Sequence, residues 1–203
     1  MPNGLKIIDI SQEVLNCEVY PGDPAPQSQL LADMSKGDLY NLTAFSMCAH
    51  NGTHIDAPFH FFQEGKAVDE MLLETFVGPA YVVEHHGIVT ADDAEMILEK
   101  AEQVHWEARE RILIKGEAIV SLEAAEVFAS EGILLFGNEA QTVGPEDAPM
   151  EVHQALLGAE IVLLEGVRLQ NVPEGAYLLN AAPLNLSRAD GAPCRAILLE
   201  LPC

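Results

Sequence analysis

The strongest constraint on the fold is a series of short apolar segments, each bounded by charged residues, glycine or proline. Runs of this length and composition are typical of β-strands. They predict strands at residues 7–10, 42–47, 81–84, 111–115, 133–136, 161–165, 176–179 and 195–201. Because these strands do not alternate regularly with helices in the sequence, we predict a mixed α/β domain instead of a barrel or a doubly wound sheet.

Two segments have the pattern of amphipathic helices. Residues 90–103 begin with Thr90 in an N-cap position, and the acidic residues that follow suit the positive end of a helix dipole. The second helix is predicted from Ser121 to Gly132, with its apolar residues on one face and a glycine placed for a C-terminal cap. Residues 20–26 contain three prolines and predict a stiff loop.

Length and charge limit the class of protein. The 203 residues can bury a core of their own, and we take residues 1–203 as a single domain. Acidic residues outnumber basic residues by 32 to 10, and the net charge of −22 would repel nucleic acids and anionic lipids. The four cysteines lack Cys-x-x-Cys spacing, which favours free thiols. We therefore expect a cytoplasmic protein without a nucleic-acid or membrane partner.

The most informative segment for function is His50-Asn-Gly-Thr-His54-Ile-Asp56-Ala-Pro-Phe-His60, which holds three of the seven histidines. In an extended chain, alternate side chains point the same way, so we expect His50, His54 and Asp56 to converge while Gly52 leaves room between them. Such nitrogen and oxygen ligands suit Zn²⁺, Mn²⁺, Fe²⁺ or Co²⁺. Surface histidines clustered by chance are the alternative, but the intervening aspartate favours a metal or catalytic site.

Three protein ligands with open positions would make a catalytic rather than a structural metal site. His153, on an expected helix, and Glu165, at the end of an expected strand, are candidates for further ligands. Taken alone, they are more simply interpreted as a surface histidine and a solvated acid. The residues by themselves leave the size of the ligand set open.

The histidine segment resembles the signature of the cyclase family, which includes bacterial kynurenine formamidase and isatin hydrolase. The similarity continues along nearly the whole chain, at residues 20–23, 137–142, 153–157, 161–166 and 191–195. It implies a swivelling β/β/α fold and a metal-dependent hydrolase that cleaves a C–N amide bond in a small-molecule substrate. It also implies a homodimer or a homotetramer.

The resemblance implies which residues would hold the metal. His50, His54 and Asp56 match the positions that bind one ion, and Asp56, His153 and Glu165 match those that bind a second. The two carboxylates would bridge the ions. We therefore expect one or two Zn²⁺ or Mn²⁺ ions per chain.

The resemblance also assigns roles on the substrate side. His60 matches a catalytic histidine that donates and accepts protons, which amide cleavage needs because an amide anion is a poor leaving group. Tyr20 stands where the formamidases have a tryptophan that packs on the substrate. Lys115 and Glu139 replace an arginine and an aspartate of the family pattern, which puts N-formylkynurenine as substrate in doubt.

Three alternatives to an arylformamidase-like enzyme stay open. The first is an isatin-type hydrolase of cyclic amides, which would use the same site. The second is a family member that binds metal or ligand without catalysis, although such a protein would not need His60 as a proton shuttle. The third is a purely structural metal site, in which case chelation should unfold the protein.

Overall fold

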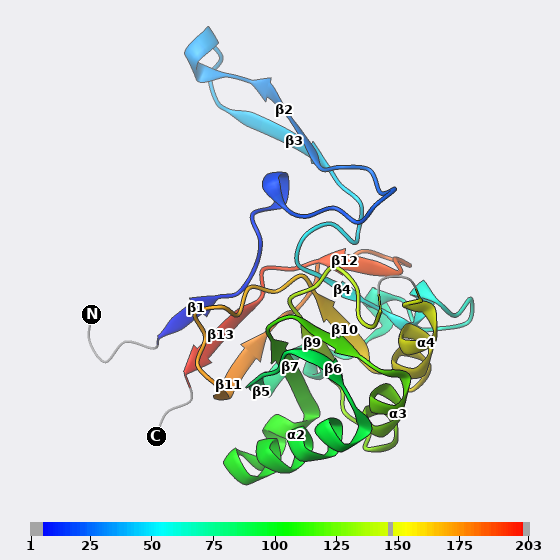
Figure 1. Ribbon diagram of the computed structural model, residues 1–203. Helices are drawn as coiled ribbons and strands as arrows, with labels where there is room; N and C mark the ends of the chain where they lie inside the picture. Colours follow the sequence, from blue (N-terminus) through cyan, green and yellow to red (C-terminus); the bar gives the residue numbers. More distant parts are fainter. Residues whose placement is uncertain (1–5, 146–147, 201–203) are drawn as a thin grey trace.

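One large mixed sheet dominates the computed structural model, which describes residues 6–145 and 148–200 (Figure 1). Its nine strands lie in the order β1-β13-β11-β5-β7-β9-β10-β4-β12. The parallel centre consists of β5 (Val77–Glu84), β7 (Arg111–Lys115), β9 (Leu135–Asn138) and β10 (Val162–Glu165). The antiparallel strands are β1 (Ile7–Asp9), β11 (Gly175–Asn180) and β13 (Ile197–Glu200) on one side, with β4 (His54–Asp56) and β12 (Gly191–Pro193) on the other. The predicted mixed α/β class is confirmed.

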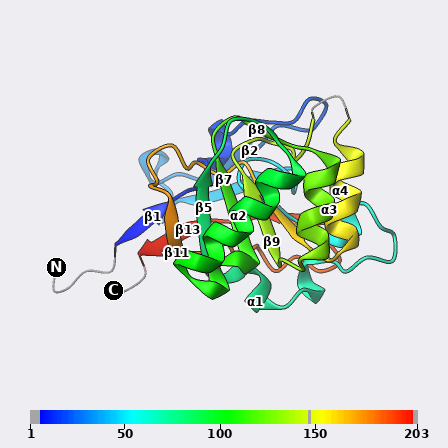
Figure 2. The same cartoon turned by 60° about the horizontal axis from the view of Figure 1, so that its bottom comes forward.

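Three helices cover one face of the parallel centre, as Figure 2 shows. They are α2 (Ala91–Val104), α3 (Leu122–Ser130) and α4 (Met150–Gly158), and the four-residue α1 (Leu73–Phe76) leads into β5. The hydroxyls of Thr90 and Ser121 accept the backbone N–H of Asp93 and Ala124, so the two predicted helices begin at the caps that the sequence indicates. None of the helices in the described ranges is both long enough and apolar enough to span a membrane.

The opposite face of the sheet forms a second core, in which side chains of the central strands pack against side chains of the outer strands. Leu113 and Leu164 point into this second core, where Ile55, Leu179 and Leu198 from β4, β11 and β13 meet them. The central strands are thus buried on both faces, which explains why their sequences are continuous apolar runs.

Most predicted strands are present with small shifts at their ends. β4 lies in the histidine segment, which we expected to be extended, and four further strands were missed: β2 (Gln27–Ala32), β6 (Gly87–Val89), β8 (Ala118–Val120) and β12. Residue 201, the last of the strand predicted at 195–201, lies outside the described residues.

The central strands also alternate with α2, α3 and α4 more regularly than we expected, because α4 completes a third connection between parallel strands. Short 3₁₀-helices lie at Val14–Asn16, Met34–Lys36, Pro58–His60, Val68–Glu70 and Trp106–Glu110.

A hairpin of β2 and β3 (Leu42–Ser46) projects away from the body of the molecule (Figure 1). We call residues 27–46 the arm. Leu30 pairs with Thr43, and Ser28 pairs with Phe45, so the side chains of Leu30 and Phe45 share one face of the hairpin. Both strands are exposed along almost their whole length.

Candidate metal centre

Strand β4, which lies between β10 and β12, carries two of the predicted ligands. His54 and Asp56 are alternate residues of this strand, so their side chains lie on the same face. On one side, the antiparallel register places His54 directly opposite Glu165 of β10. On the other side, Asp56 lies opposite Gly191 of β12. The sheet register thus brings together residues that are more than a hundred positions apart in sequence.

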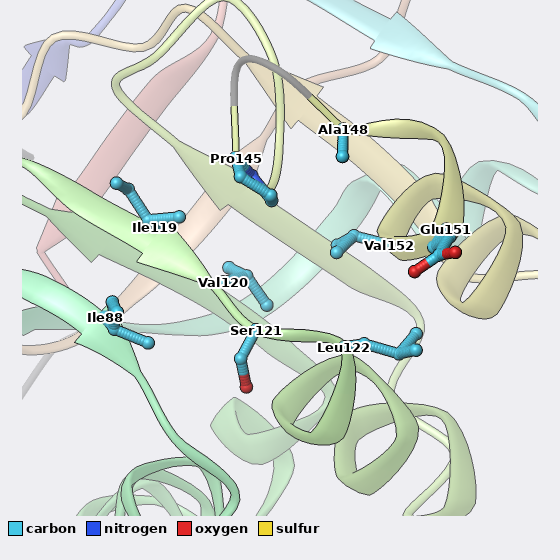
Figure 3. Close-up of a pocket in the computed structure, with 9 residues that line it drawn as sticks. All are labelled: Ile88, Ile119, Val120, Ser121, Leu122, Pro145, Ala148, Glu151 and Val152. Carbon is cyan, nitrogen blue, oxygen red and sulfur yellow. The ribbon is translucent and has the colours of Figure 1, made fainter.

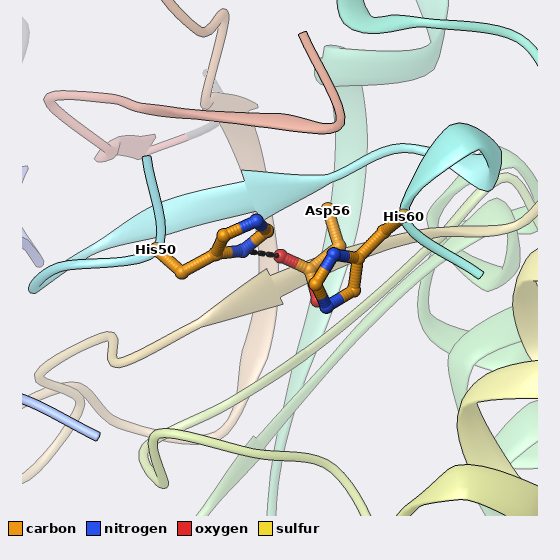
Figure 4. A group of neighbouring side chains, drawn as sticks. All are labelled: His50, Asp56 and His60. Atoms are coloured by element: carbon orange, nitrogen blue, oxygen red, sulfur yellow. Dashed lines mark hydrogen bonds and ion pairs between the residues drawn. The ribbon is translucent and has the colours of Figure 1, made fainter. Parts of the chain in front are cut away.

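His50 reaches the same site, although by a different route from the predicted one. Its Nδ1 lies 2.7 Å from Oδ1 of Asp56 (Figure 4). The expectation of an extended segment was wrong here, because β4 begins only at His54 and residues 49–53 form a turn. Gly52 has a φ of 68° in this turn, a left-handed conformation that favours glycine.

Helix α4 carries His153, whose ring faces the carboxylates of Asp56 and Glu165. The Nε2 atom of His153 lies 3.4 Å from Oε1 of Glu165 and 3.8 Å from Oδ2 of Asp56. His153 and Glu165 are both buried, at 4% and 3% exposure. Their interpretation from the residues alone, as a surface histidine and a solvated acid, is therefore wrong, whereas the family resemblance indicated their place.

The histidines are oriented as metal ligands usually are. His54 donates its Nδ1–H to the carbonyl of Gly52 at 2.9 Å, and His153 donates its Nδ1–H to the carbonyl of Pro149 at 2.8 Å. The Nε2 atom of each ring therefore faces the carboxylates, and Nε2 of His54 is buried without a hydrogen-bond partner among the described residues. This atom lies 3.2 Å from Asp56 and 3.5 Å from Glu165. A backbone carbonyl on one ring nitrogen and a convergent lone pair on the other is the arrangement that fits a metal ion.

The electrostatics of the cluster also favour a cation. Burial opposes ionisation of Asp56, but hydrogen bonds from His50 and His54 outweigh it and hold its pKa well below the usual range. Burial likewise lowers the pKa of His54, but Asp56 and Glu165 outweigh it and raise that pKa well above the usual value. Two adjacent buried carboxylates require positive charge nearby. Protonated histidines can supply this charge, and a divalent ion would supply more.

The possible ligand atoms fall into two overlapping groups. One consists of His54, Asp56 and Glu165, whose ligand atoms lie within 4.8 Å of one another, and the other of His50, Asp56 and His60. Asp56 belongs to both groups. The partition differs from the expected one, because His54 groups with Glu165 rather than with His50. Imidazole nitrogens and carboxylate oxygens suit a divalent transition metal.

His60 lies at the open edge of the cluster, next to a residue that the sequence analysis missed. Its Nδ1 is 3.1 Å from Oδ2 of Asp190, and Nε2 of His50 is 2.9 Å from the same oxygen. The rings of His50 and His60 pack with their centroids 4.2 Å apart. No local pattern singles out Asp190, which is 130 residues from His60 in sequence.

The predicted substrate-side residues do not join the cluster. Tyr20 is 37% exposed in the loop before the arm. Lys115 contacts Glu84 at 3.2 Å, and Glu139 accepts two backbone N–H groups at 2.8 Å each. None of the contacts found for these residues in the described part of the chain reaches the histidines.

A separate hollow of about 220 Å³ lies between β8 and α4 (Figure 3). Apolar side chains such as Ile119, Leu122 and Val152 line most of it, and Glu151 is its one charged residue. It contains none of the predicted site residues. The chemistry of the molecule is thus concentrated at β4.

Comparison with known proteins gives three findings. A family model described as "Putative cyclase" matches residues 8–145. The kynurenine formamidase of Salinibacter ruber is 36% identical over 214 residues, which cover 98% of this chain and 99% of that protein. Among solved structures, a "potential metal-dependent hydrolase with cyclase activity" is 25% identical, with a TM-score of 0.81 over 98% of this chain and 100% of that one.

A second solved structure, isatin hydrolase A from Labrenzia aggregata bound to benzyl benzoate, shows similarity of fold alone. It is 22% identical, with a TM-score of 0.81 over 98% of this chain and 94% of that one. The fold that the resemblance implied is thereby confirmed.

Proposed function

The chain belongs to the cyclase family, and from this premise we propose that it is a metal-dependent hydrolase that cleaves the C–N amide bond of a small N-acyl substrate of the arylformamide type. The observation that carries the proposal is the convergence of His54 and His153 on the buried carboxylates of Asp56 and Glu165. Full-length similarity to kynurenine formamidases supports the class of bond that is cleaved.

Five residues would hold the metal in this proposal. They are His50, His54, Asp56, His153 and Glu165. Asp56 faces three imidazoles and Glu165 faces two, which supports a site for one or two ions. We propose Zn²⁺ or Mn²⁺, since both accept this mixture of nitrogen and oxygen ligands. When bound, such an ion would lower the pKa of a water molecule and polarise the amide carbonyl.

His60 would move the proton that the reaction requires. Its side chain is 29% exposed, so a substrate can reach it, whereas the side chains of His54 and Asp56 are each 1% exposed. His60 can accept a proton from the attacking water and then donate it to the leaving nitrogen. The products are a carboxylic acid and an amine. The proton that His60 takes from water is the one that the leaving nitrogen receives, so a single histidine is sufficient.

The substrate is proposed from the relatives. N-formylkynurenine is the first candidate because proteins named kynurenine formamidase match almost the whole chain. Tyr20 would contribute an aromatic ring that packs on this substrate, with a hydroxyl in place of the indole N–H of tryptophan. Isatin is the second candidate, supported by a shared fold and by a site that could open a cyclic amide with the same residues.

We also propose a homodimer or homotetramer in the cytoplasm. The arm supports association because it exposes large apolar side chains, including Leu30, Leu39 and Phe45. Its only charged residues are Asp33, Lys36 and Asp38, whereas the whole chain has a charge of −22. An apolar, nearly neutral projection is the surface on which two such acidic molecules could meet. Free thiols at Cys17, Cys48 and Cys194 support a reducing compartment.

Metal analysis combined with an assay tests the proposed function. Wild-type protein and His60→Ala should contain the same amount of transition metal, while His60→Ala should hydrolyse N-formylkynurenine only at a small residual rate. Metal binding without turnover of N-formylkynurenine or isatin would reject both substrates. Full activity of His60→Ala would reject the proton shuttle.

A further inference from the structure

A single oxygen atom of Asp190 joins the two histidines at the edge of the cluster. Oδ2 of Asp190 lies 2.9 Å from Nε2 of His50 and 3.1 Å from Nδ1 of His60. An ionised carboxylate can only accept hydrogen bonds, so both histidine nitrogens must donate to it. The protons on the two rings are therefore fixed by their contact with one side chain.

The backbone around Asp190 is held firmly in place. The carbonyl of Asp190 accepts the N–H of Ala57 at 2.9 Å, directly after the strand that carries Asp56. The carbonyl of Ala189 accepts the N–H of Val68 at 3.0 Å. The N–H of Arg188 donates to the side chain of Asp69 at 2.8 Å. Three consecutive residues are thus tied to the histidine segment or to the residues that follow it.

We infer that Asp190 is a positioning residue that sets the tautomer and the orientation of His60. This inference rests on the proposed hydrolase function. With the proton of His60 held on Nδ1, the Nε2 atom keeps a free lone pair and can accept a proton from water. Asp190 then stabilises the imidazolium that forms, and Nε2 returns the same proton to the leaving nitrogen.

The contact with His50 extends this role to the metal cluster. Because Nε2–H of His50 donates to Asp190, Nδ1 is the nitrogen that faces Asp56. A carboxylate that binds the outer nitrogen of a ligand histidine orients the ring and increases its basicity. Asp190 therefore links the proposed shuttle to a proposed metal ligand.

Kinetics of Asp190→Asn test the inference, measured at saturating Zn²⁺ so that weaker metal binding does not dominate. We expect kcat to fall about 10–100-fold, as for other residues that orient a ligand or a catalytic group. In a His60→Ala background, the same substitution should reduce the residual rate much less than it reduces kcat of the wild type, because only the contact of Asp190 with His50 is then left to lose. Equal losses in both backgrounds would overturn the inference.

A matched control separates positioning from anchoring of the segment. Asp69→Ala removes the side chain that holds the N–H of Arg188 but leaves Asp190 beside the histidines. It should lower the melting temperature and retain kcat within about threefold. Asp190→Glu keeps a carboxylate and should restore part of the rate that Asp190→Asn loses. If Asp69→Ala reduces kcat as much as Asp190→Asn does, the effect is merely structural.

Nuclear magnetic resonance of the imidazole nitrogens gives a readout that does not depend on activity. In Zn²⁺-loaded wild-type protein, His60 should carry its proton on Nδ1, and this preference should be lost in Asp190→Asn. An unchanged tautomer would overturn the inference even if the enzyme is active. Conversely, absence of hydrolysis together with the expected change of tautomer would reject the proposed function alone.

Discussion

The net charge of the candidate metal centre depends on which of its histidines are protonated. Beside Asp56 and Glu165, the pKa of His54 is raised well above its usual value despite burial, and the pKa of His153 is also raised. In the metal-free protein near neutral pH, His54 should therefore carry a proton on Nε2 that partly offsets the charge of the two carboxylates. A metal ion needs the lone pair that this proton occupies.

Metal binding should consequently release protons. When Zn²⁺ is added to metal-free protein at about pH 7, we expect about one proton or more to be released per ion, because His54 must lose its proton to become a ligand. The apparent affinity should therefore fall as the pH is lowered. Calorimetric titration in two buffers of different ionisation enthalpy measures the number of protons. Identical heats in the two buffers would show that the rings are neutral before the metal binds.

Residues of this site differ in how far the sequence could predict them. His50, His54, Asp56 and His60 are close together in the chain, and their types indicate metal chemistry. His153 and Glu165 became ligand candidates only through the family resemblance, because a single histidine or acid has no pattern of its own. Asp190 could not be predicted, since only the pairing of β12 with β4 brings it to the cluster.

At the level of elements, β12 is as important to the site as β4. A Cβ atom built on Gly191 would lie 2.6 Å from Cε1 of His50 and 2.7 Å from the carbonyl oxygen of Ile55. Only glycine lets β12 approach β4 this closely while His50 keeps its position. Gly191 thus permits the contact on which the positions of both His50 and Asp190 depend.

Gly191→Ala should damage the site. Since the new methyl group meets backbone as well as a ring, we expect a destabilisation of about 1–3 kcal/mol and weaker metal binding. Denaturant unfolding and metal titration measure the two effects. Gly158→Ala is the control, because its Cβ would meet only the end of the Phe62 ring at 3.2 Å. Equal metal affinity of Gly191→Ala and wild type would contradict the proposed importance of this contact.

The elements that sequence analysis missed share a physical reason. β12 is Gly-Ala-Pro, which has no strand-forming residue and contains a proline that only an edge strand accommodates. β6 and β8 have three residues each and pair only with one another. β2 begins with Gln-Ser-Gln and lies outside the core, so burial imposes no apolar pattern on it. The buried strands, by contrast, could be predicted because burial of both faces requires continuous apolar sequences.

On the scale of the whole molecule, the arm is the feature that a single chain does not explain. A two-stranded hairpin is marginally stable by itself in water. Here Leu30 and Phe45 share an uncovered face on a hairpin that extends away from both cores (Figure 1). A second copy of the chain would cover this face and stabilise the hairpin.

Substitution of one arm residue tests this association. Phe45→Lys places a charge on the apolar face and should shift the protein towards the monomer mass in light scattering at micromolar concentration. Ile88→Lys is the matched control, because Ile88 is as exposed as Phe45, at 62%, but lies on the body of the molecule. It should leave the mass unchanged. A monomeric wild type, or equal dissociation of both variants, would reject the arm as the interface.

The most direct test of the account is to restore metal to the metal-free protein in steps. At each step, the metal bound and the rate of N-formylkynurenine hydrolysis are measured on the same sample, for the wild type and for Glu165→Gln. The account predicts that the wild-type rate rises with bound Zn²⁺ or Mn²⁺ to a plateau at one or two ions per chain. Glu165→Gln should bind metal about tenfold more weakly or worse, because one buried negative charge is lost. Hydrolysis that is equally fast without metal, or failure of the wild type to bind either ion, would contradict the central claim.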